Sequence, residues 1–184
     1  MDFKRRVKRR FLIAFVWSGF LFGMAASPPL VGGPAPHFAL ETADGPKVRL
    51  ADLKGQSIVL NFWATWCAPC TLEMPELQKA HQALKGKAAV IGINLAESRD
   101  RVKEFVHLHH VSFPLLLDTY GNVAQDYEVL HLPVTYFISP DGIIRDKVFG
   151  GGLTQKMIED RIRQIETPPN PAAAEALNKL KARP

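Results

Sequence analysis

The two cysteines of this chain, Cys67 and Cys70, are the residues best suited to chemistry. They stand three residues apart in the string Trp66-Cys67-Ala68-Pro69-Cys70, and the 184 residues contain no other cysteine. A zinc site needs four ligands, and the chain has neither a second cysteine pair nor histidines spaced to complete one. Covalent haem attachment needs a histidine directly after the second cysteine, where this chain has Thr71. We therefore expect neither a metal nor another cofactor.

A purely structural disulfide is the remaining alternative to redox chemistry. Closing a loop of four residues removes little entropy from the unfolded chain, worth about 2 kcal/mol. A chain with a single disulfide would gain more stability by closing a long loop. We therefore interpret Cys67 and Cys70 as a redox pair that alternates between dithiol and disulfide.

The residues after the pair have the spacing of a helix. Leu72, Leu77, Ala80 and Leu84 are apolar at helical intervals, so a helix that starts at Cys67 places both sulfurs on one face. Free N–H groups and the helix dipole stabilise a thiolate at the N-terminus of such a helix. Pro69 suits the first turn, because proline lacks an N–H and the N–H groups of the first turn have no partner within the helix. We predict that Cys67 is the exposed attacking thiolate and that Cys70 is the buried resolving thiol. Trp66 is expected to form an apolar wall against which partners dock.

The surrounding pattern predicts an α/β fold in which helices flank a central mixed sheet. Apolar runs of strand length alternate with helical patterns, and two turns with Asp-Gly indicate hairpins. Strands are expected at 58–63, 88–94 and 113–117, helices at 101–110, 122–127 and 153–165, and hairpins at 38–42 with 47–50 and at 135–139 with 143–149.

The N-terminus has the pattern of an export signal or membrane anchor. Six basic residues lie within residues 1–10, and residues 11–26 carry no charge. A positive segment followed by an apolar one enters the bilayer with its charge left inside. We expect residues 1–26 to be a signal sequence or anchor, with the uncleaved anchor as the better interpretation. A Pro/Gly-rich linker over 27–35 would then lead to the domain over 36–166 and a flexible tail over 167–184, all in an extracytoplasmic space.

The net charge of +5 does not indicate a nucleic-acid partner. The chain has 23 basic and 18 acidic residues, and the surplus is accounted for by residues 1–10. The rest is balanced and has no run of Lys and Arg, whereas a phosphate-binding face needs clustered cations.

An ordered set of motifs resembles one branch of the thioredoxin superfamily. The string NFWATWCAPC at 61–70 looks like the active-site strand and motif of the thioredoxin fold. CTLEMP, GINLAES and FPLLLDTYGNVAQDYEVLHLPVTYFISPDG follow in order along the chain. Together these motifs are similar to the TlpA/ResA-like thiol-disulfide oxidoreductases of the AhpC/TSA-Redoxin branch. The resemblance covers about residues 34–165 and implies a thioredoxin-like fold with an additional N-terminal β-hairpin.

The resemblance also assigns roles to residues around the pair. Pro133 aligns with the cis-proline of the family, so Leu132 and Pro133 would border a substrate-binding surface that also includes Trp66, Ala68 and Pro69. Glu73 resembles the glutamate that follows the second cysteine, and would raise thiol pKa values and move a proton during resolution. The competing interpretation of Glu73 is an exposed acid that compensates the helix dipole.

Asn61 occupies the position at which cytoplasmic thioredoxins carry a buried Asp in the active-site strand. A neutral amide cannot act as a base, which gives Glu73 more weight as the proton carrier.

The resulting expectation is an exported protein-disulfide reductase. The resemblance implies a membrane thiol carrier of the CcdA/DsbD kind as electron donor, and exported proteins with cysteine pairs, such as apocytochrome c or copper-site assembly proteins, as targets. Two alternatives stay open: a disulfide oxidase or isomerase with the same site, and a non-enzymatic binding module with a structural disulfide.

Overall fold

A five-stranded mixed sheet forms the centre of the protein. The computed structural model describes residues 31–166, and its main sheet has the strand order β5-β4-β3-β6-β7. β3 (Ser57–Trp63), β4 (Ala88–Leu95) and β5 (Leu115–Asp118) run parallel, whereas β6 (Val134–Ile138) runs antiparallel to β3, and β7 (Ile144–Phe149) antiparallel to β6. The predicted mixed sheet and its closing hairpin are thereby confirmed.

β3 is the central strand and is buried along its whole length. Its side chains alternate between the two faces of the sheet, because successive residues of a strand point in opposite directions. Val59 and Trp63 contribute to one apolar core, and Leu60 and Phe62 to the other. A strand covered on both faces reads as a continuous apolar run, and this explains the sequence IVLNFW.

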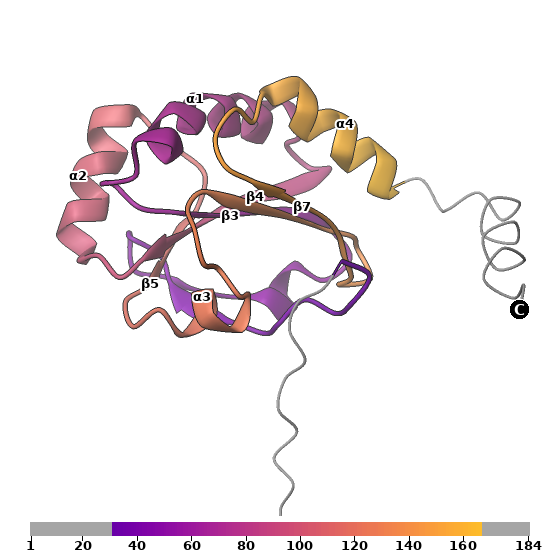
Figure 1. Ribbon diagram of the computed structural model, residues 1–184, viewed down its shortest axis with the longest axis horizontal. Coiled ribbons are helices and arrows are strands. Elements are labelled where there is room, and N and C mark those ends of the chain that lie inside the picture. Colours follow the sequence, from indigo (N-terminus) through magenta and orange to yellow (C-terminus); the bar gives the residue numbers. More distant parts are fainter. Residues whose placement is uncertain (1–30, 167–184) are drawn as a thin grey trace, which may run out of the picture.

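Helices cover both faces of the sheet (Figure 1). α1 (Ala68–Ala83), α2 (Arg99–His109) and α4 (Gln155–Glu166) contribute apolar side chains to the first core, among them Leu77, Phe105 and Ile158. α3 (Asn122–Asp126) lies on the opposite side with the N-terminal part of the described chain. Because β3 leads directly into α1, the residues between them lie at the carboxyl edge of the parallel strands.

The N-terminal part packs on the second face of the sheet. β1 (Ala39–Glu41) pairs antiparallel with β2 (Lys47–Arg49), and a 3-10 helix, η1 (Leu50–Leu53), follows. Before β1, residues 32–35 exchange backbone hydrogen bonds with residues 142–144. Part of the segment that we expect to be a linker is therefore fastened to the domain.

The predicted signal or anchor over 1–26 and the predicted tail over 167–184 lie outside the described residues. Within residues 31–166, none of the helices combines the length and the apolar character that crossing a membrane requires.

Candidate active site

The two cysteines lie at the start of α1, where the sequence places them. Cys67 is the N-cap, Pro69 stands in the first turn, and the two sulfurs form a disulfide with a Cα–Cα distance of 5.3 Å. The Cys70 N–H donates to the Cys67 Sγ at 3.3 Å. A negative charge on this sulfur would meet that N–H and the positive end of the helix dipole, which favours a thiolate.

The exposure of Cys67 differs from the prediction. The residue is only 5% exposed in the oxidised state, and Cys70 is 1% exposed. The predicted order of accessibility holds, but the prediction of an exposed Cys67 is wrong, because its side chain turns into the disulfide and belongs to the first apolar core. The accessible surface of the motif comes instead from its neighbours: Trp66 is 66% exposed, and Ala68 and Pro69 are also exposed.

The peptide bond between Leu132 and Pro133 is cis, as the resemblance implied. The carbonyl of Pro133 accepts the N–H of Gly150 at 3.0 Å, so the loop after β7 is fastened to the segment before β6. The same loop reaches the cysteine motif: a Cβ added at Gly151 would lie 2.9 Å from the Pro69 Cβ. Gly151, the middle one of three consecutive glycines at 150–152, allows this approach because it has no side chain. Sequence reasoning assigned them no role, although the run itself was a signal for close backbone contact.

Glu73 is buried, which contradicts the interpretation as an exposed acid. It is 2% exposed, and its Oε1 accepts the N–H of Leu153, just before α4, at 3.0 Å. Its Oε2 has no hydrogen-bond partner among the described residues. Burial raises the pKa of Glu73, and the N–H groups of Leu153 and Gly152 oppose this only in part. The side chain therefore holds a proton more readily than an ordinary glutamate, one helical turn after Cys70.

The raised pKa of Glu73 makes the stability of the fold depend on pH. The folded state binds this proton more tightly than the unfolded state, so stability falls as the pH rises from the ordinary value of 4.5 through the raised pKa, and is constant above it. We expect Glu73→Gln to flatten this part of the curve, measured as the free energy of unfolding in urea at several pH values. An unchanged slope in Glu73→Gln would contradict the assignment.

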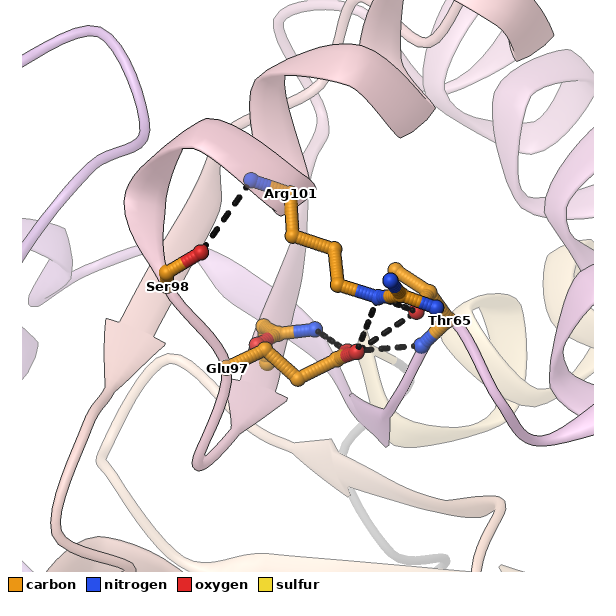
Figure 2. A network of polar contacts seen from close by, with 5 residues as sticks. Thr65, Glu97, Ser98 and Arg101 are labelled. Atoms are coloured by element: carbon orange, nitrogen blue, oxygen red, sulfur yellow. Dashed lines mark hydrogen bonds and ion pairs between the residues drawn. The ribbon is translucent and has the colours of Figure 1, made fainter.

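A second carboxylate, Glu97, contacts the residue two positions before Cys67 (Figure 2). Its oxygens accept the Thr65 N–H at 2.7 Å and the Thr65 hydroxyl at 2.5 Å. Asn94 donates its side-chain amide at 2.8 Å, and Arg101 forms an ion pair at 3.2 Å. Sequence reasoning singled out the string GINLAES but assigned no role to Glu97, because nothing local shows that its side chain reaches Thr65.

The structure also describes three other residues that the sequence singled out, Asn61, His131 and Leu132. Asn61 is buried in β3 and donates to the Thr135 hydroxyl at 2.9 Å, so a neutral amide does occupy this position. His131 is exposed and Leu132 half-buried beside the cis-proline. Among residues 31–166 no group of His, Cys, Asp or Glu is arranged to hold a metal ion.

A disulfide at the N-terminus of α1, together with a cis-proline before β6 of a mixed five-stranded sheet, defines a thioredoxin-like thiol-disulfide oxidoreductase. Residues 31–147 match the model of the AhpC/TSA family, and the chain belongs to this family. The redox interpretation of Cys67 and Cys70 is therefore the one that the family supports.

Individual relatives place the chain near the ResA-like enzymes. It is 38% identical to the thiol-disulfide oxidoreductase ResA of Bacillus subtilis over 136 residues, which is 73% of this chain and 75% of that protein. A putative thiol:disulfide interchange protein DsbE from Chlorobium tepidum superposes with a TM-score of 0.69 at 26% identity, covering 74% of this chain and 97% of the other. A secreted thiol-disulfide isomerase from Corynebacterium glutamicum superposes with a TM-score of 0.64 at 27% identity, over 71% and 84% of the two chains. The resemblance to this branch is confirmed.

Proposed function

We propose that this oxidoreductase is an extracytoplasmic protein-disulfide reductase. The reduced Cys67 thiolate attacks a disulfide of the substrate, forms a mixed disulfide and releases one substrate thiolate. Cys70 then attacks the Cys67 sulfur, the second substrate thiolate leaves, and two electrons have passed to the substrate. The single observation that carries this proposal is the pairing of the Cys67–Cys70 disulfide with a buried carboxyl group, Glu73, that can take up the proton of Cys70.

The proposed location rests on the first 26 residues of the sequence. Their basic start and uncharged continuation favour a signal or anchor that keeps residues 27–184 outside the cytoplasm. The relative from Corynebacterium glutamicum, described as secreted, supports the same location. Disulfides form and persist outside the cytoplasm, so a domain that exchanges disulfides would find its substrates in that compartment.

The proposed partners follow from the direction of the reaction. A reductase outside the cytoplasm needs electrons from inside, so we propose a membrane thiol carrier of the CcdA/DsbD type as donor. Exported proteins with cysteine pairs, such as apocytochrome c or copper-site assembly proteins, are the proposed targets. The exposed Trp66, Ala68 and Pro69, together with Leu132 and Pro133, are the proposed docking surface.

A trapping experiment tests location and partners together. Full-length Cys70→Ser is expressed in cells, thiols are blocked with acid and N-ethylmaleimide, and disulfide-linked partners are identified by mass spectrometry. Exported proteins with paired cysteines are expected among them, and they should be absent with Cys67→Ser/Cys70→Ser. Exclusive capture of cytoplasmic proteins would contradict the location, and capture by the double variant would contradict the role of Cys67.

Disulfide isomerisation is the second candidate, because the relative from Corynebacterium glutamicum is described as an isomerase. An isomerase would return a scrambled disulfide protein to activity without a net supply of electrons. A reductase would instead leave the same substrate with free thiols. Counting free thiols during the reaction separates the two.

A further inference from the structure

Three hydrogen-bond donors and one cation converge on the carboxylate of Glu97. They are the backbone N–H and the hydroxyl of Thr65, the side-chain amide of Asn94 and the guanidinium of Arg101. The side chain of Glu97 is only 6% exposed, so water cannot replace these donors. A carboxylate accepts at both oxygens, whereas half of a glutamine amide donates and would face other donors. This set of partners therefore requires the acid.

The surroundings keep Glu97 ionised. Burial alone would raise its pKa, but the hydrogen bonds from Thr65 and Asn94 and the charge of Arg101 outweigh burial and lower the pKa. Glu97 is thus an anion at neutral pH, and hydrogen bonds to a charged group are stronger than neutral ones.

The residues on either side of Glu97, Ala96 and Ser98, have specific backbone roles. Ala96 has a φ of 56°, in the left-handed region that residues other than glycine rarely adopt. Ser98 caps α2 and accepts the Arg101 N–H, so Arg101 projects from the first turn of α2 back to Glu97 and Thr65 (Figure 2). An uncommon backbone conformation that persists at such a position is a reason to look for function there.

Thr65 connects Glu97 to the reacting sulfur. Thr65 is the second residue of a turn in which the Cys67 N–H donates to the Ala64 carbonyl at 3.2 Å. The turn also carries the exposed Trp66 and ends at Cys67, the N-cap of α1. Glu97 therefore binds Thr65, which lies between the end of β3 and Cys67.

We infer that Glu97 is a positioning residue for thiol-disulfide exchange: by binding Thr65 it fixes the turn at 64–67 and keeps the Cys67 sulfur at the N-terminus of α1. The inference rests on the proposed exchange reaction at Cys67, and Glu97 acts on that sulfur through Thr65. The Cys67 thiolate then retains the Cys70 N–H and the helix dipole as its stabilising partners.

Replacing Glu97 by glutamine separates positioning from a simple charge effect. Loss of a negative charge near a thiol, by itself, lowers the thiol pKa, because the thiolate meets less repulsion. Loss of the turn geometry raises the thiol pKa, because the thiolate leaves its N–H partner and the helix dipole. Positioning therefore predicts that the Cys67 pKa rises in Glu97→Gln.

The experiment measures alkylation of the reduced, full-length protein by iodoacetamide across pH, with the modified cysteine identified by mass spectrometry. We expect Glu97→Gln to raise the apparent pKa of Cys67 and to slow its reaction with insulin disulfides at pH 7 by about tenfold, the weight of one hydrogen bond to a charged group. The matched control is Glu41→Gln, which removes a carboxylate from the ion pair with Arg99, the first residue of α2. The control should remain within about twofold of the wild type, as expected for an exposed ion pair.

Two results would overturn the inference. A Cys67 pKa that falls or stays constant in Glu97→Gln would show that the turn geometry does not depend on this carboxylate. An equal loss of rate in Glu41→Gln would show that the slower reaction of Glu97→Gln comes from a general loss of stability. If Glu97→Gln does not fold, Thr65→Ala decides, because it removes only the hydroxyl that Glu97 and Arg101 contact. It should shift the Cys67 pKa upward with about a threefold loss of rate, the weight of one neutral hydrogen bond, and an unshifted pKa would contradict the inference.

Discussion

Cys67→Ser is expected to abolish the reduction of insulin disulfides by this protein. Serine keeps the size and the N-cap geometry of residue 67, but its hydroxyl does not ionise at neutral pH and cannot attack a disulfide. The measurement is the precipitation of insulin B chain in the presence of dithiothreitol, with full-length protein. Full activity in Cys67→Ser would contradict the assignment of Cys67 as the attacking thiol.

Cys70→Ser should give a different defect that identifies the resolving thiol. Attack by Cys67 still occurs, but no second thiol follows, so the mixed disulfide with the substrate accumulates. Non-reducing electrophoresis should show a new band that disappears with dithiothreitol. If Cys70→Ser leaves no adduct and Cys67→Ser does, the roles of the two sulfurs are reversed. The exposure of Cys67, 5% against 1% for Cys70, favours Cys67 as the sulfur that meets the substrate first.

Glu73→Gln is expected to slow the resolving step by about a hundredfold, the lower range of general acid–base catalysis. Cys70 must lose its proton before it attacks. The Oε2 of Glu73, which has no hydrogen-bond partner within residues 31–166, is the acceptor that the site offers one turn away. A glutamine cannot take up this proton. The measurement is a single-turnover reaction in which formation and decay of the mixed disulfide are followed separately, and only the decay should slow.

Glu76→Gln is the matched control for this prediction. Glu76 lies three residues further along α1, and its Oε2 accepts the Gln155 N–H at 2.8 Å, just as Glu73 accepts that of Leu153. Both glutamates therefore connect α1 to the start of α4, but Glu76 is only half-buried and pairs with Lys79. Equal slowing in the two variants would reduce Glu73 to a structural residue.

Much of the fold was predictable because its signals are local. The apolar run at 58–63 predicts a strand buried on both faces, and β3 is buried at every residue. The Pro-Asp-Gly turn at 140–142 predicts the β6–β7 hairpin, which the structure confirms. The apolar spacing after the cysteine pair predicts a helix that starts at Cys67, and in the structure Cys67 is the N-cap of α1.

The parts that the residues alone did not predict depend on contacts between distant segments. The burial of Glu73 is set by the loop at 150–153, which is 80 residues away along the chain. The contact of Glu97 with Thr65 crosses from the end of β4 to the end of β3, and these two ends are adjacent because the strands are parallel. No pattern within a few residues of Glu73 or Glu97 contains this information. The low exposure of Cys67 has the same origin, since it follows from packing of the closed disulfide into the core.

The reduction potential of the Cys67–Cys70 pair tests the central claim most directly. The full-length protein is equilibrated in glutathione and dithiothreitol buffers, and the reduced fraction is measured by thiol labelling. A reductase should have a potential near that of thioredoxin, about −270 mV. A potential near about −120 mV, that of a strong oxidant, would contradict the proposed direction and make the protein a donor of disulfides.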